Sequence, residues 1–294
     1  MPVPAIRQTF SGTASDATLP MSVPDRVMSV PAFDQGGIRH LFDHNNPATG
    51  LTGAPTNGQP IVDVSAHENG AFTFTGTGTL AYSGGGIDFS GVANVGATLD
   101  IPASVAADIW GNGTVPQYFL QGLYVKLPTK AQWVTAIRPL SCFTTASNGF
   151  QSEADLVTIA MVVVGATPYL RVIRQLSLGP ATVDQFDIPL PDSVFGTVVQ
   201  IGFWRNAAGQ MAQLVWSAGS LQVAKTVNAN NIADFSTKKG KIGIGTSFWN
   251  NADTMGKTWR LYRGFIENLR TSGRDPAAVL AADWKRVQAR AVFS

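Results

Sequence analysis

Apolar and polar residues alternate in short runs along most of the chain from residue 61 onward. Each run is rich in β-branched and aromatic residues and is bounded by Gly, Pro, Asn or Asp, a pattern typical of strands joined by turns. In one run, Val199, Ile201 and Phe203 share a face and Gln200 lies on the other. The runs cover 71–91, 118–128, 133–140, 155–165, 169–178, 197–206, 211–219, 221–228, 241–245 and 257–269.

These runs follow one another without intervening helices. The connections 206–210 and 216–220 contain glycine and suit hairpins. Many short strands in this arrangement favour two packed antiparallel sheets over a parallel sheet with crossover helices. The sequence therefore predicts an all-β fold, an antiparallel β-sandwich of the jelly-roll type, over residues 61–272.

The first sixty residues differ from the rest because apolar and polar residues follow no regular period in them. Pro or Gly recurs every few residues, which disfavours a helix or a central strand. Apolar residues such as Phe10, Met21 and Phe33 are nevertheless retained, unlike in a solvated tail. Residues 1–60 are therefore predicted to form an extended arm that packs on its own domain or on a neighbouring subunit.

One helix is predicted within residues 273–294. Asp275 and Pro276 form an N-cap and first-turn pair. The apolar residues that follow lie on one helical face: Leu280, Trp284, Val287 and Ala291. We expect this face to dock on the sandwich or on a partner subunit.

Composition excludes several classes. The chain is 45% hydrophobic and 14% charged, too few charges for a disordered chain or a coiled coil. The 12 basic residues of 225–294 are spread among apolar positions rather than clustered, so no nucleic-acid partner is predicted. No apolar run is long enough for membrane insertion, and no apolar leader is present. The single cysteine, Cys142, forms no intrachain disulfide.

Metal and hydrolase chemistry find little support. His40 and His44 are spaced i, i+4, but Pro47 would truncate a helix there and the metalloprotease glutamate is missing. Both are predicted to be surface or interface histidines, and no metal site is predicted. Glycoside hydrolysis needs two carboxylates at a defined separation. The only three glutamates lie 85 and 114 residues apart, so no catalytic residue is predicted, although an aspartate-only site stays open.

Glycan binding requires an aromatic platform and a few amide or carboxylate groups, usually on loops at the edge of a sandwich. Two stretches supply them: 247–256 with Trp249, Asn250, Asn251 and Asp253, and 108–114 with Trp110 and Asn112. The alternative is that both tryptophans plug the core and the polar residues form turns. Asp253 could bind Ca²⁺ with neighbouring carbonyls, but no calcium motif is present and no cofactor is predicted.

The C-terminal residues resemble a known family. The stretch GKIGIGTSFWNNADTMGKTWRLYRGFIENLRTSGRDPAAVLAADW, within the last 180 or so residues, is similar to the end of concanavalin A-like lectin/glucanase (laminin-G-like) jelly-roll domains of bacteriophage and prophage structural proteins. In those domains a strand like WRLYRGFIENL is followed by a T-S-G-R turn and a short helix that ends in Asp-Trp. The family's calcium-binding and glucanase residues have no counterparts in this chain.

This resemblance implies a virion structural protein of the phage tail tip, baseplate or fibre apparatus, assembled in the host cytoplasm and not an enzyme. Its N-terminal arm would attach it to other virion proteins, and it would form a homo-oligomer, by analogy a trimer. One alternative is a carbohydrate-binding module that recognises a host-surface glycan. A further alternative is a polysaccharide depolymerase.

Overall fold

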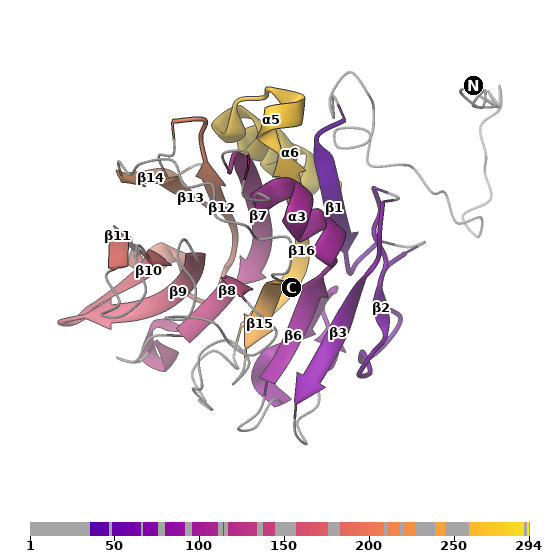
Figure 1. Ribbon diagram of the computed structural model, residues 1–294. Helices are drawn as coiled ribbons and strands as arrows, with labels where there is room; N and C mark the ends of the chain where they lie inside the picture. The colour runs from indigo at the N-terminus through magenta and orange to yellow at the C-terminus, as the bar shows by residue number, and fades with distance from the viewer. Residues whose placement is uncertain are drawn as a thin grey trace.

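The computed structural model describes residues 36–46, 49–65, 67–75, 80–91, 96–110, 114, 117–133, 138–144, 157–175, 183–208, 211–217, 220–226, 239–244, 259–290 and 293. These residues form two antiparallel sheets of eight strands each, which face one another as two layers (Figure 1). The predicted all-β antiparallel sandwich with a small C-terminal helix is confirmed.

Helices pack on the outer face of sheet A, and we call them the helical layer. Its strands are β1 (Ile38–Asp43), β4 (Ala81–Ser83), β5 (Gly86–Asp88), β7 (Phe119–Lys126), β12 (Val198–Arg205), β13 (Met211–Ser217), β14 (Ser220–Thr226) and β16 (Arg260–Asn268). The order is β14-β13-β12-β7-β16-β5-β4. β1 and β5 share the remaining edge of β16, because β5 pairs with its first residues and β1 with Arg263 to Glu267.

Sheet B is the opposite layer. Its order is β11-β10-β9-β8-β15-β6-β3-β2. The strands are β2 (Pro60–Ile61), β3 (Gly70–Thr75), β6 (Gly96–Ile101), β8 (Arg138–Thr144), β9 (Val157–Val164), β10 (Thr167–Gln175), β11 (Val183–Pro189) and β15 (Lys239–Ile244). Three short 3₁₀ turns interrupt the loops: η1 (Phe89–Gly91), η2 (Lys130–Gln132) and η3 (Asp192–Val194).

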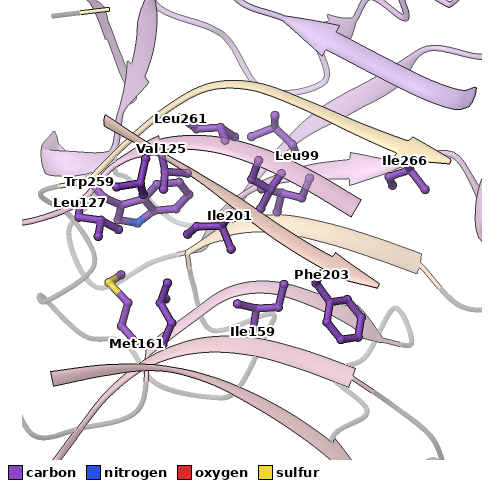
Figure 2. Close-up of a cluster of buried hydrophobic side chains, with 14 of the residues drawn as sticks. Leu99, Val125, Leu127, Ile159, Met161, Ile201, Phe203, Trp259, Leu261 and Ile266 are labelled. Atoms are coloured by element: carbon purple, nitrogen blue, oxygen red, sulfur yellow. The ribbon is translucent and has the colours of Figure 1, made fainter. Parts of the chain in front are cut away.

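The core lies between the two sheets, as the alternation predicted. Ile201 and Phe203 of β12 point toward Ile159 and Met161 of β9 (Figure 2), and all four side chains are buried. Gln200 faces the other way, toward the helical layer, where its amide donates to the Tyr124 hydroxyl.

Helix α6 (Pro276–Arg290) covers the outer face of sheet A. Asp275 caps it by accepting a hydrogen bond from the Ala278 amide at 2.7 Å. Its apolar stripe of Leu280, Trp284 and Val287 is buried against this sheet, so the helix docks on its own sandwich. Gly202 of β12 makes this close approach possible, because a Cβ there would lie 2.1 Å from Leu280 Cδ1.

Two segments differ from the expectation. Helix α3 (Ala103–Trp110) interrupts the strands where no helix was predicted, and a short helix α5 (Leu269–Ser272) follows β16. β1 lies within the predicted arm but is part of sheet A, with Leu41 and Phe42 buried. The sandwich therefore begins before residue 61; residues 1–35 lie outside the described ranges. None of the helices described here is long and apolar enough to span a membrane.

Candidate functional site

The structure describes only part of the two stretches that were predicted to bind glycans. Trp110 is the last residue of α3, while Asn112 and Trp249, Asn250, Asn251 and Asp253 lie outside the described residues. β16 begins beside Lys126 and ends beside Phe119, the two ends of β7. Helix α3 adjoins the second of these ends, where Asp108 contacts Asn268.

Helix α3 closes one end of the sandwich. Val105, Ala106 and Ile109 lie on one face and are buried in the main core, whereas Ser104 is exposed. The i, i+4 spacing of Val105 and Ile109 forms the apolar stripe of a short amphipathic helix. In Figure 1, α3 lies near the upper ends of β7 and β1, below α5. Asp108 is therefore held at the rim of this end.

Asp108 is the centre of a polar cluster that joins α3 to sheet A. Its Oδ2 accepts a hydrogen bond from Arg39 Nε at 2.6 Å and another from Asn268 Nδ2 at 2.9 Å. Its side chain is 41% exposed. Within the described ranges, Asp108 Oδ1 accepts no hydrogen bond. One carboxylate oxygen is thus fixed by the protein, and the side chain remains partly exposed at the surface.

The neighbours of Asp108 are themselves oriented. Asn268 caps α5, with its Oδ1 accepting from the Thr271 amide, which turns its NH₂ group toward Asp108. Arg39 also donates to Thr271 Oγ1 at 3.2 Å, and Arg270 Nη2 donates to the Asp108 carbonyl at 3.3 Å. We call Arg39, Asp108, Asn268, Arg270 and Thr271 the α3 cluster.

The α3 cluster offers hydrogen-bond acceptors and donors side by side on a partly exposed surface. A fixed carboxylate oxygen accepts hydroxyl protons, and arginines supply donors in a planar fork. No group of three His, Cys, Asp or Glu that could hold a metal occurs in the part of the chain that the structure describes. The α3 cluster can therefore both accept and donate hydrogen bonds at the surface of the protein.

Buried polar side chains gather at the same end on the inner face of sheet A. Arg205 is fully buried and donates to Gln117 Oε1 at 2.9 Å, and its cross-strand neighbour in β7 is Phe119, beside Asn268. Gln213 is also buried, and neither polar atom of its side-chain amide has a hydrogen-bond partner among the described residues. Burying an unpaired amide costs free energy.

The histidines of β1 and the turn after it contradict the expectation of surface or interface positions. His40 and His44 are buried in an aromatic row with Phe42 and Phe72, and the Nε2 atom of each has no partner. Desolvation lowers the pKa of His44 to about 3, against a smaller opposing effect of Asp43. Desolvation also lowers the pKa of His40, opposed by Asp63 and the Glu68 carbonyl. Both imidazoles are neutral at pH 7.

Comparison with known proteins identifies the fold. No protein-family model and no curated protein sequence matches this chain. The solved binding domain of botulinum neurotoxin serotype D is similar in structure, with a TM-score of 0.50 and 11% identity over 79% of this chain and 48% of that one. A mutant of HCR/D gives a TM-score of 0.53 and 10% identity over 85% and 52%. The chain spans about half the length of these structures, and the likeness shows a shared β-sandwich fold.

Proposed function

We propose that this chain is a non-catalytic recognition domain that binds a glycan at the α3 cluster. The observation that carries the proposal is the environment of Asp108, whose carboxylate is fixed through Oδ2 while Oδ1 accepts no hydrogen bond from the described residues and the side chain is partly exposed. A carboxylate held in this way is ready to accept a pair of sugar hydroxyls. Trp110, one of the predicted glycan-binding residues, lies two residues farther along the chain.

The fold supports a binding role. The serotype D structure is named as a binding domain, and this chain shares its β-sandwich. A binding site on a sandwich typically lies on loops and helix ends that a rigid scaffold positions. The α3 cluster fits this pattern because its residues come from β1, α3, β16 and α5, four elements anchored in the core.

Substituting Asp108→Asn is expected to weaken glycan binding about 10–100-fold, the effect of losing a hydrogen bond to a charged acceptor. A glycan array identifies the ligand, and titration calorimetry with that glycan then measures the affinity. The matched control is Asp192→Asn, because Asp192 also forms a single ion pair, with Lys130, at the opposite end of the sandwich. Thermal unfolding checks that both variants keep the fold.

Two results would contradict the proposal. Asp108→Asn could bind as tightly as the parent while Trp249→Ala loses binding, which would show that the glycan binds at the predicted stretch 247–256 and not at the α3 cluster. The glycan array could also show no bound glycan under any condition tested. A reducing-sugar assay on capsule or lipopolysaccharide tests the depolymerase alternative, because release of sugar ends would show hydrolysis rather than recognition.

The virion role is a second proposal, and it is supported by the sequence resemblance of the C-terminal stretch. The strand, turn and helix that this resemblance implied are present as β16, α5 with Gly273 in the left-handed region, and α6. We propose that such a protein would act as a homo-oligomer in a phage tail structure. Light scattering that shows a compact monomer at micromolar concentration would count against it.

A further inference from the structure

Sheet A buries a small group of polar side chains on the face that lines the core. Side chains alternate between the two faces of β12 and β13, and Phe203 and Met211 belong to the main core. Arg205 and Gln213 each lie two residues from one of them, so both also point between the sheets. Gln117, which precedes β7, reaches the same place, because its Oε1 accepts a hydrogen bond from Arg205 Nη1 at 2.9 Å. We call Gln117, Arg205 and Gln213 the inner cluster.

The inner cluster is buried from solvent. Arg205 and Gln213 are 0% exposed, and Gln117 is 1% exposed. Neither Nε2 nor Oε1 of Gln213 has a hydrogen-bond partner among the described residues, and the same holds for Gln117 Nε2. Polar groups buried at this depth are nearly always hydrogen-bonded. Two primary amides with open hydrogen-bonding atoms in one cluster therefore point to a bound ligand.

The strand register places the inner cluster around Phe203. Phe203 lies directly opposite Gln213, and Arg205 lies directly opposite Met211. Arg205 and Gln213 are therefore diagonal neighbours on one face, about 7–8 Å apart and within reach of each other's long side chains. The buried ring of Phe203 points toward sheet B (Figure 2). The cluster thus combines a few hydrogen-bonding groups with an aromatic ring, a composition typical of a site for a small ligand.

The open atoms determine which ligand chemistry fits. Gln213 Nε2 donates and its Oε1 accepts, while Gln117 Nε2 donates. An anion can accept from both amides but cannot donate to Gln213 Oε1, and a cation can donate to this oxygen but cannot accept from either amide. Hydroxyl groups do both, and two adjacent hydroxyls match the two polar atoms of a primary amide. The inner cluster is therefore suited to an uncharged molecule with several hydroxyl groups.

We propose that the inner cluster binds one small uncharged polyol, of the size of a single sugar ring, enclosed between the two sheets. Two adjacent hydroxyls contact the amide of Gln213, a further hydroxyl accepts from Gln117 Nε2, and Phe203 packs on the carbon atoms of the ring. This site goes beyond the proposed function, because it is separate from the α3 cluster and does not depend on it. Entry requires local opening of this end of the sandwich, since all three side chains are buried.

Equilibrium dialysis of the full chain against radiolabelled D-glucose, D-galactose and D-mannose tests this site, because dialysis tolerates slow entry. We expect saturable binding of at least one of these sugars. Gln213→Met keeps the length of the side chain but removes both hydrogen bonds, so the affinity should fall at least about 10-fold. Gln213→Leu is the second variant. Without sugar, neither variant should unfold at lower urea concentration than the parent, because each removes an unpaired buried amide.

Gln200→Met is the matched control. Gln200 is also a fully buried glutamine of sheet A, but it lies on the opposite face, where its amide donates to the Tyr124 hydroxyl. Its loss should lower the stability of the fold and leave the affinity for the sugar unchanged. Asp108→Asn should also keep this affinity, because Asp108 belongs to the α3 cluster.

Absence of binding for all three sugars would overturn the proposal, since water alone would then accompany the amides. Equal affinity in the parent and both Gln213 variants would overturn it as well. Loss of binding in Asp108→Asn with unchanged affinity in the Gln213 variants would assign the sugar to the α3 cluster, which supports the proposed function and refutes the inner site. Binding that is lost in the Gln213 variants and kept in Asp108→Asn supports the inner site whatever the glycan array shows.

Discussion

Replacing Arg263 with methionine is expected to lower the free energy of unfolding by about 3–5 kcal/mol. Arg263 of β16 is fully buried, with Nη1 donating to Asp43 Oδ2 at 3.3 Å and Nη2 to Asp283 Oδ1 at 3.0 Å. Removing the guanidinium leaves two buried carboxylates without this partner. The loss is large because a desolvated charge is costly once it is no longer paired.

The environment of Asp283 is a second reason to expect a large loss of stability in Arg263→Met. It lies on α6 and also accepts hydrogen bonds from the Tyr124 hydroxyl at 2.8 Å and from Arg286 at 3.0 Å. Burial alone would raise the pKa of Asp283, but the charges of Arg263 and Arg286 outweigh it and lower this pKa. Arg263 thus joins the first strand of sheet A to the C-terminal helix.

Urea denaturation at pH 7 measures the change, and Arg260→Met is the matched control. Arg260 is the first residue of β16, three residues before Arg263, and pairs with Asp88 in a partly exposed position, so its loss should cost no more than about 1 kcal/mol. The lowered pKa of Asp283 means that its contribution is present above about pH 4 and is lost as the pH falls through the folded-state pKa. The difference in free energy of unfolding between the parent and Arg263→Met should therefore become smaller at acidic pH. Equal losses of unfolding free energy in Arg263→Met and Arg260→Met would contradict the expectation that the buried ion pairs of Arg263 matter more.

The strands and α6 were predictable because each obeys a local rule. Val199, Ile201 and Phe203 alternate at a period of two, and Leu280, Trp284 and Val287 recur at a helical period after an N-cap. Both elements need one apolar face that packs against the core. In both cases about ten consecutive residues are enough to reveal that face. The sandwich follows because such faces must be paired.

Helix α3 and β1 were missed for different reasons. The signal for α3 was present, since Pro102 precedes a helix whose Val105 and Ile109 lie i, i+4 apart, but it covers only two turns. β1 is a single strand between stretches rich in Pro and Gly, and its place in the sheet is fixed by β16, more than 200 residues away in the chain. Local period carries no information about such a pairing.

The α3 cluster depends even more on tertiary structure. Asp108 lies in a stretch that was predicted to bind glycans, but Arg39 is 69 residues away in sequence and Asn268 is 160. No motif joins them, because the strand order alone brings them together. The buried positions of His40 and His44 were likewise unpredictable, since a histidine on a short alternating stretch is compatible with either face.

Replacing Trp259 with alanine is expected to lower the free energy of unfolding by about 3–5 kcal/mol. Trp259 precedes β16, is fully buried, and stacks on Phe89 with ring centroids 4.2 Å apart and an interplanar angle of 7°. Its side chain belongs to the main core between the sheets (Figure 2). Truncation would remove the stacked ring and leave a cavity that rigid sheets cannot close.

Trp259→Phe separates the loss of packing from the loss of the indole N–H. The Nε1 atom of Trp259 has no hydrogen-bond partner, so removing it relieves an unpaired buried donor. Phenylalanine can retain a stack on Phe89, and we expect its cost to stay below about 2 kcal/mol. Urea denaturation followed by far-ultraviolet circular dichroism measures both variants independently of tryptophan emission. A loss of unfolding free energy below about 1 kcal/mol in Trp259→Ala would contradict this prediction. It would mean that the core around Trp259 closes over the missing ring, so that the interface between the sheets is more deformable than its burial indicates.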